Sequence, residues 1–194
     1  MSAPILLASG SPRRRELLEQ LGLQFAITAP DVDESPLAGE RPIAYVARVA
    51  LDKANAVSLV GTTSGDALVI AADTTVELAG AIIAKPIDGD DARAMLRRLS
   101  GRTHEVHTGV ALRRGDRHLT ATVTSLVTFV ELSDEVIEWY VATGEPFDKA
   151  GGYAIQGAGA VLVASVEGSV SNIIGLPLHT VVELAEQLGV TLLA

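Results

Sequence analysis

The strongest constraint on the fold is a pair of long β-rich runs between Thr103 and Leu132. They read THEVHTGVALRR and RHLTATVTSLVTFVEL, and the dipeptide Gly115-Asp116 separates them. Two runs rich in β-branched residues on either side of such a dipeptide predict a β-hairpin. We therefore expect a sheet that contains an antiparallel pair of strands.

Shorter patterns on either side of this hairpin alternate between strand and helix. Strands are expected at residues 4–9 (PILLAS), 24–28 (QFAIT), 67–78, a short run ending at Lys85-Pro86, and 160–168. Helices are expected after Ser11, from Pro42 to about Val60, and over 88–101, 133–145 and 176–189, with a Gly-rich loop at 148–159. The order β-α-β-α-β-α-β-β-α-β-α predicts an α/β fold, with a mixed twisted sheet and helices on its faces. Because no repeat or linker interrupts it, the chain 1–194 is expected to form a single domain.

Composition limits the partners and the compartment. The net charge is −9, whereas a general nucleic-acid or anionic-membrane surface would require a basic face. The chain has no cysteine, which excludes disulfides and thiolate metal sites and suits a reducing cytosol. No apolar run reaches the roughly 18 residues of a membrane span, and MSAPILLASGS lacks the basic start of a signal peptide. We therefore expect a cytoplasmic protein that binds neither nucleic acid nor membrane.

Three consecutive arginines stand at the start of the first expected helix. Ser11 and Pro12 have the character of an N-cap and a first helical residue, so Arg13–Arg15 fall in or beside the first turn, where the helix dipole is already positive. With the free N–H groups of that turn they form a strong anion site, and phosphate is the obvious anion. The alternative is a solvated charge run that Glu16 and Glu19 offset.

A second unusual charge is Asp73, which interrupts the apolar strand LVIAADTTVEL. An unpaired carboxylate there is costly, so Asp73 requires a cation or metal beside it, or else acts as a buried turn-capping acid. Lys85 ends the neighbouring short strand. Lys53 is expected on the exposed side of the helix that begins at Pro42.

Acidic residues crowd the loop between the second expected strand and that helix. Carboxylate oxygens suit a hard cation, and a solvated, dynamic loop is the equal alternative. The acids concerned are Asp31, Asp33, Glu34 and Glu40. The HEVH motif is a weaker metal candidate, because a spacing of three on a strand directs His104 and His107 to opposite faces; we expect ordinary, partly exposed histidines.

The ordered motifs resemble those of one known family, the Maf proteins, which are septum-formation-inhibitor-like nucleoside triphosphate pyrophosphatases. The matching segments are LASGSPRRRELL, DVDES, YVARVALDKA, AADTTV, AKPIDGDDARAMLRRLSGRTHEVHTGVAL, GEPFDKAGGYAIQG and EGSVSNIIGLPL, which cover nearly the whole chain. The resemblance implies a fold related to the inosine triphosphate pyrophosphatases, with two lobes around a cleft and frequent homodimers. It also implies hydrolysis of a nucleoside triphosphate to the monophosphate and pyrophosphate with a divalent metal, Mg²⁺ or Mn²⁺.

The same resemblance assigns roles to residues. Asp73 matches the proton-accepting aspartate, and Arg13, Thr74 and Gln156 match positions tied to substrate choice. Polar groups at the phosphate and metal end are matched by Ser9, Arg14, Glu34, Lys53 and Lys85, with Glu34 and Asp73 as the candidate metal ligands. Glutamine at 156 is typical of the branch that acts on dTTP and UTP, whereas the branch that prefers 7-methyl-GTP tends to carry glutamate. Ala84 and Arg15 depart slightly from the usual pattern.

Other functions stay open at this point. One is a nucleotide-binding regulator of cell division, which senses a triphosphate without turning it over. Asp73 argues against this regulator, because a protein that only senses a nucleotide does not need a carboxylate in an apolar strand, where its burial is costly. Another is a phosphatase that releases orthophosphate and a diphosphate, and a third is the same enzyme class acting on 7-methyl-GTP. The dTTP and UTP pyrophosphatase is the leading interpretation.

Overall fold

The computed structural model, which describes residues 3–58 and 66–193, has the mixed sheet that the sequence predicts. Seven strands form one sheet in the order β2-β1-β3-β5-β6-β7, and β4 pairs separately with β3. β1 is parallel to β2 and β3, whereas the pairs β3–β4, β3–β5, β5–β6 and β6–β7 are antiparallel. The strands are β1 (Ile5–Ala8), β2 (Ala26–Thr28), β3 (Leu68–Leu78), β4 (Ala81–Ile83), β5 (Thr103–Arg114), β6 (Arg117–Phe129) and β7 (Val163–Glu167).

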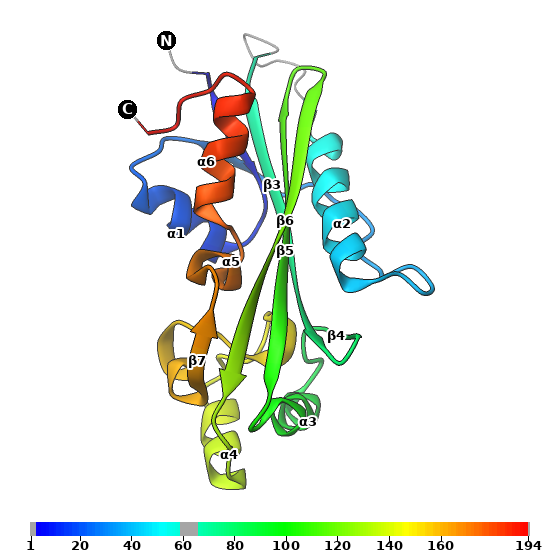
Figure 1. The fold of residues 1–194 in the computed structure, drawn as a ribbon, viewed down its shortest axis with the longest axis vertical. Helices are drawn as coiled ribbons and strands as arrows, with labels where there is room; N and C mark the ends of the chain where they lie inside the picture. Colours follow the sequence, from blue (N-terminus) through cyan, green and yellow to red (C-terminus); the bar gives the residue numbers. More distant parts are fainter. Residues whose placement is uncertain (1–2, 59–65, 194) are drawn as a thin grey trace.

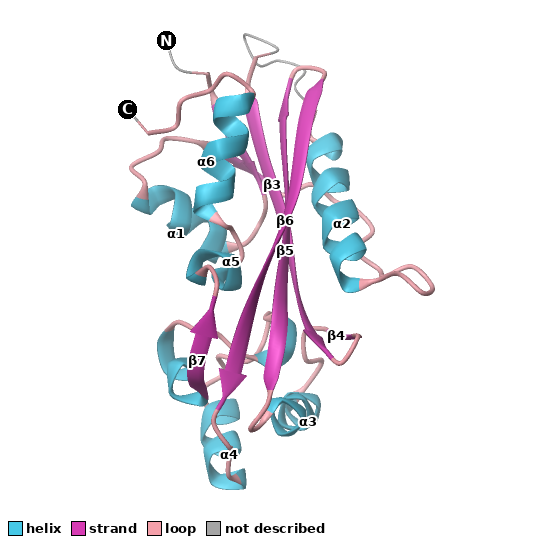
Figure 2. Ribbon diagram, in the orientation of Figure 1, coloured by secondary structure: helices cyan, strands magenta, loops and turns pink. Residues whose placement is uncertain are grey.

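The predicted hairpin is confirmed as the β5–β6 pair. Its register runs without a shift from Thr103 opposite Thr128 to Arg114 opposite Arg117. Together with β3, these strands run along the length of the molecule and twist as they go (Figure 1). Helices cover both faces of this long, narrow sheet (Figure 2).

The helices follow the expected order with a few differences. They are α1 (Pro12–Gln20), α2 (Pro42–Ala56), α3 (Gly89–Leu99), α4 (Asp134–Ala142), α5 (Val170–Ile174) and α6 (Leu178–Gln187), with 3-10 turns η1 (Ala150–Gly152) and η2 (Gly157–Leu162). The helix that was expected to reach Val60 ends at Ala56, and Val60 lies outside the described residues. Helix α5 was not predicted, because five residues are too few to show a periodicity. No helix in the described parts of the chain is long and apolar enough to cross a membrane.

Apolar side chains gather at two ends of the sheet. At one end α1 and α6 pack on one face over Leu7, Ile70 and Val110, while α2 packs on the other face over Val69 and Ala111. At the other end α3, α4 and the residues before β7 enclose a separate cluster. The long strands join the two ends, which are the two lobes that the resemblance implied (Figure 1).

A close approach at Gly109 sets the position of α2. A Cβ atom there would lie 2.2 Å from the carbonyl oxygen of Val46, so only glycine lets this helix rest directly on β5. Gly109 pairs with Asp73 on β3. The contact therefore brings one face of α2 over the strand that carries Asp73.

Candidate active site

One cavity of about 850 Å³ collects every residue to which the family resemblance assigns a role. Its wall is built from the β1–α1 turn, the loop before α2, the middle of β3, the segment after β4 and the segments 147–156 and 173–175. The predicted residues in this wall are Ser9, Arg13, Arg14, Glu34, Lys53, Asp73, Thr74, Lys85 and Gln156. Residues from both ends of the chain and both lobes thus meet at one place.

Lys53 joins two carboxylates at one side of this cavity. Its Nζ atom donates to Oδ1 of Asp73 at 2.8 Å and lies 2.9 Å from Oε1 of Glu34. The side chains of Lys53 and Asp73 are both 8% exposed, whereas that of Glu34 is 45% exposed. Buried charges of this kind are tolerated because they are paired.

This geometry corrects the expectation that Lys53 lies on the exposed side of its helix. Helical periodicity alone does not show which structures cover a helix, and here β3 and the loop with Glu34 cover Lys53. Tyr45, two turns earlier on α2, donates its hydroxyl to the backbone oxygen of Glu34 at 3.0 Å. Burial, with the charges of Asp73 and Glu34, raises the pKa of Tyr45 to about 12. The hydroxyl therefore stays a donor that holds Glu34 in place.

The loop acids do not gather into one cation site. Glu40 accepts hydrogen bonds from Nε and Nη2 of Arg48 at 2.7 and 2.8 Å, and this pairing lowers the pKa of Glu40 to about 2. Asp33 accepts from the backbone N–H of Ser35, and Asp31 is exposed. Within the described residues, Glu34 is the only one of the four acids that lines the cavity.

The arginines at the start of α1 divide into three environments. Arg14 is buried and donates to the Gly175 backbone oxygen at 2.7 Å, to Oγ of Ser9 at 3.2 Å and to Oγ1 of Thr74 at 3.0 Å. Burial lowers the pKa of Arg14, although the charge of Asp73 opposes this effect. Arg14 therefore ties β1, β3 and the C-terminal end of α5 together.

Arg13 and Arg15 differ as their positions predict. Arg13 lines the cavity, and its Nη2 atom lies 3.4 Å from the backbone oxygen of Asp148. Arg15 lies outside the cavity wall and pairs with Glu19 at 3.6 Å on the helix surface. Ser11 is the N-cap, and within the described residues it makes no side-chain capping bond, so the first-turn N–H groups lack that partner beside the cavity.

Gln156 also lines the cavity, and it lies on a turn whose backbone is hydrogen-bonded by two side chains of the other lobe. Glu145 accepts from the N–H groups of Ala158 and Gly159 at 2.9 Å each, and Tyr140 donates to Glu145 at 3.0 Å. The hydroxyl of Tyr140, a buried residue, also accepts from the N–H of Ala154 at 3.0 Å. We call Tyr140 and Glu145 the clamp, because they bind the chain on both sides of Gln156.

The clamp was not predicted from the sequence, although one signal in the sequence marks its position. Gly157 and Gly159 leave no room for a side chain, since a Cβ atom would lie 2.7 Å from Glu145 and 2.2 Å from the Ala154 backbone oxygen, respectively. A pair of glycines beside a candidate specificity residue thus marks a turn packed against another segment. Burial tends to raise the pKa of Glu145, but the hydrogen bonds from Gly159 and Ala158 outweigh it, so that the pKa is lowered.

The expectation that the histidines of HEVH are partly exposed is wrong. His104 and His107 are 2% and 0% exposed, because neighbouring strands and helices cover both faces of β5. His104 makes a 2.7 Å hydrogen bond with the hydroxyl of Tyr153, and burial lowers the pKa of His104 to about 4. His107 has different partners, Thr124 and Glu77.

The cavity wall combines cations, carboxylates and the first-turn N–H groups of α1 in one space. Its volume falls within the range of roughly 300–1,000 Å³ that is usual for small-molecule sites. The cations suit a polyanionic ligand, while an acid beside it can accept a proton.

Comparison with known proteins gives similarities along nearly the whole chain. A family model described as "Maf-like protein" matches residues 4–188. A dTTP/UTP pyrophosphatase of Myxococcus xanthus (strain DK1622) is 53% identical over 188 residues, which cover 97% of this chain and 94% of that relative. A dTTP/UTP pyrophosphatase of Symbiobacterium thermophilum is 50% identical over 185 residues, which cover 95% and 94%. A solved structure, "The structure of the Staphylococcus aureus Ham1 protein", has a TM-score of 0.45 at 16% identity and covers 68% of this chain and 72% of its own.

Proposed function

Because the chain belongs to the Maf family, we propose that it hydrolyses dTTP and UTP to the nucleoside monophosphate and pyrophosphate. The observation that carries the proposal is the ion-paired group of Asp73, Lys53 and Glu34, which shares one cavity with the N-terminus of α1 and with Gln156. A nucleoside triphosphate has matching parts: a chain of charged phosphates, a reacting α-phosphate and a base. The enzyme is accordingly a hydrolase that acts on acid anhydrides.

The phosphates are assigned to the cationic side of the cavity. Arg13, Lys85 and Lys53 line it and can offset the charge that develops on the leaving pyrophosphate, together with the first-turn N–H groups of α1. Arg14 also lines the cavity, but three of its donors already bind protein oxygens. Its role is to hold Ser9 and Thr74 in position beside the substrate as well as to contribute positive charge.

Asp73 is assigned the proton transfer. A water molecule that attacks the α-phosphate must lose a proton, and a carboxylate in the cavity wall can accept it. Lys53 fixes the Oδ1 atom of Asp73, and within the described residues no partner is seen for Oδ2, which is therefore assigned to the water. The side chain enters the cavity from the middle of β3, where Asp73 pairs with Gly109 of β5.

A divalent cation, Mg²⁺ or Mn²⁺, fits the carboxylate side of the cavity. Oxygen atoms of Glu34 and Asp73 already converge on one cationic centre, the Nζ atom of Lys53, at 2.9 and 2.8 Å. Such oxygen donors suit hard divalent cations. Glu34 and Asp73 would hold the ion, which when bound would polarise a phosphate oxygen and lower the pKa of water.

Gln156 is assigned the base. A carboxamide donates and accepts at once, so it can pair with both a carbonyl and the ring N–H of uracil or thymine. The branch that prefers 7-methyl-GTP tends to carry glutamate at this position, and a carboxylate can only accept hydrogen bonds. The 7-methyl-GTP alternative is therefore less well supported for a chain with glutamine. The clamp holds the turn that presents Gln156 to the cavity.

We also propose the wider setting of the activity. Residues 1–194 act as one catalytic domain in the cytoplasm, and two copies form a homodimer that binds neither nucleic acid nor membrane. The net charge of −9 and the absence of cysteine support the compartment and the lack of nucleic-acid binding. Light scattering during size-exclusion chromatography measures the oligomer.

The Asp73→Asn variant tests the chemical assignment. It retains the volume of the side chain but removes the charge and the proton acceptor, so turnover of dTTP should fall by at least about 100-fold, the lower end of the usual contribution of general-base catalysis. Circular dichroism should show an unchanged fold, and equilibrium dialysis should show retained dTTP binding. Asp52→Asn, on the surface of α2 beside Arg48, is the matched control and should leave turnover unchanged. Near-normal turnover in Asp73→Asn would make Asp73 a structural residue.

A further inference from the structure

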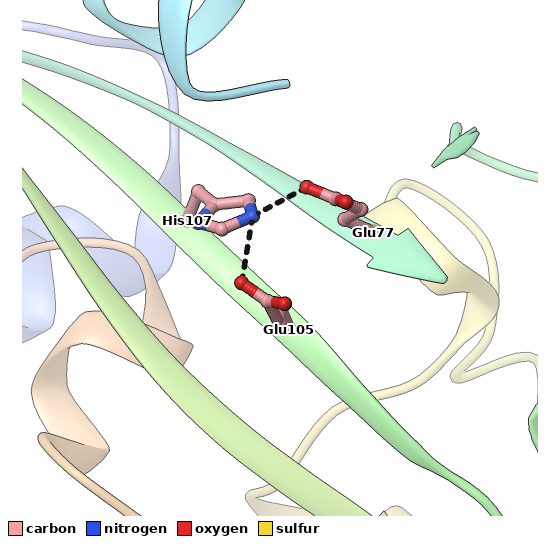
Figure 3. Close-up of side chains that lie close together, drawn as sticks. All are labelled: Glu77, Glu105 and His107. Atoms are coloured by element: carbon pink, nitrogen blue, oxygen red, sulfur yellow. Dashed lines mark hydrogen bonds and ion pairs between the residues drawn. The ribbon is translucent and has the colours of Figure 1, made fainter. Parts of the chain in front are cut away.

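A second group of metal-binding side chains lies on the same sheet, outside the nucleotide cavity. Glu77 on β3 and Glu105 and His107 on β5 each point one ligand atom toward the others, and these atoms all lie within 4.8 Å of one another (Figure 3). Within the described residues this is the one group of at least three such side chains that are close enough to share an ion. None of the three lines the cavity that contains Asp73.

The ring of His107 is fixed from outside the group. Its Nδ1 atom bonds to Oγ1 of Thr124 on β6 at 2.8 Å, and the residue is 0% exposed. Nε2 is thereby directed to the two carboxylates, at 2.8 Å from Glu77 and 3.5 Å from Glu105 (Figure 3). Histidines that bind metals are usually held in this way, with the second ring nitrogen bonded to a neighbouring group.

Within the described residues, no lysine or arginine forms an ion pair with the two carboxylates of this group. Glu77 and Glu105 are direct partners in the register of β3 and β5, and like charges placed opposite each other destabilise a sheet. Among the described residues, the ion pairs formed by these two carboxylates involve His107 alone. One imidazole carries at most one positive charge, so a divalent cation would balance the two carboxylates where His107 cannot.

The spacing and the approach both suit an ion. Ligand atoms that lie about 2.0–2.1 Å from zinc in a tetrahedron are roughly 3.3 Å from each other. The Nε2 atom of His107 lies 2.8 Å from Glu77 and 3.5 Å from Glu105, one distance on either side of that value. Glu77 also lines a second cavity, of about 400 Å³, between the start of α2 and the β3–β4 turn. This opening gives an ion a path from solvent and leaves space for water as a fourth ligand.

We propose that Glu77, Glu105 and His107 form a binding site for a divalent transition metal, with Zn²⁺ as the best fit. Imidazole together with carboxylates favours such ions over Mg²⁺ and Ca²⁺, which prefer oxygen ligands alone. The site is distinct from the one assigned to Glu34 and Asp73, because Glu77 is four residues from Asp73 along an extended strand, or roughly 13 Å. The ion links β3 to β5 and so stabilises the long strands that join the lobes.

Equilibrium dialysis of the untagged full chain against Zn²⁺, without nucleotide, tests the proposal. The wild type should bind zinc at micromolar concentrations, and excess Mg²⁺ should not displace it. Glu105→Gln, which changes a side chain that is 46% exposed, should weaken binding by at least about tenfold, as should Thr124→Val through the loss of ring orientation. Zinc should also raise the unfolding temperature of the wild type more than that of Glu105→Gln.

Two controls separate this site from the proposed catalytic one. Asp73→Asn should retain the zinc affinity of the wild type, and so should Glu167→Gln, which removes an exposed acid on β7. The proposal is overturned if the wild type binds no zinc, if Glu105→Gln binds it as tightly as the wild type, or if Asp73→Asn abolishes binding. Because no turnover is measured, the zinc site and the pyrophosphatase activity can fail independently.

Discussion

Replacing Glu145 with glutamine should loosen the turn that carries Gln156. The two carboxylate oxygens of Glu145 receive three hydrogen bonds: Oε1 from Tyr140 and Gly159, and Oε2 from Ala158. An amide offers one oxygen, and it will take the place of Oε1 because two donors lie there. Its NH₂ group then faces the N–H of Ala158, so one charge-assisted bond is lost and two are weakened. Since Glu145 is only partly buried, we expect a loss of about 1.5 kcal/mol in the free energy of unfolding, the lower end for such bonds.

The functional cost should fall on base selection. A turn that is no longer held on one side positions Gln156 less well, so kcat/KM for dTTP and UTP should fall about tenfold, equivalent to about 1.4 kcal/mol, with a smaller loss for GTP. Urea unfolding and steady-state kinetics with the three nucleotides measure the two effects. Glu138→Gln, on the preceding helix α4 and paired with Arg93 at the surface, is the control and should leave stability nearly unchanged. A Glu145→Gln variant with normal stability and an unchanged pyrimidine preference would refute the role of the clamp.

Three further changes test separate parts of the account. Arg13→Ala should raise KM and lower kcat for dTTP together, whereas Arg15→Ala, outside the cavity, should have a small effect; equal losses would indicate a diffuse electrostatic effect. Gln156→Glu should lower kcat/KM for dTTP and UTP by at least about tenfold and purine activity by less, and an unchanged profile across dTTP, UTP, CTP, GTP and 7-methyl-GTP would contradict the assignment. The third change is His104→Gln. Burial in the folded protein lowers the pKa of His104 from an ordinary value of about 6.5 to about 4, so as the pH falls the unfolded chain protonates His104 before the folded protein does. Stability is therefore lost as the pH drops from about 6.5 to about 4. Urea unfolding should show that wild type loses about 3 kcal/mol more than His104→Gln between pH 7 and pH 4, and parallel losses would show that His104 titrates normally.

Local signals predicted the elements and much of the site. Ser11-Pro12 begins α1 as expected, because a helix start depends on residues next to each other. Likewise the side chains of Asp88 and Ser133 cap α3 and α4. The expected strand at 160–168 begins only at Val163, since the residues before it form a 3-10 turn against Glu145.

What the sequence did not predict depends on contacts between distant segments. Lys53 is buried because Gly109, 56 positions later in the chain, lets α2 rest on the sheet, and no periodicity within α2 reports this approach. The burial of His107 and the role of Glu145 have the same cause, since their partners come from other elements. The ordered motifs did indicate which residues share a site, but not that Arg14 ties the structure together while Arg13 lines the cavity.

The products formed from dTTP test the central claim most directly. Purified wild type is incubated with dTTP and Mg²⁺ or Mn²⁺, and the products are separated by anion-exchange chromatography, with pyrophosphate and orthophosphate measured apart. We predict dTMP and pyrophosphate in equal amounts, with both formed at least about 100-fold more slowly by Asp73→Asn. The appearance of dTDP and orthophosphate would show a phosphatase, and binding of dTTP without any turnover would show a sensor; either result would contradict the proposed pyrophosphatase.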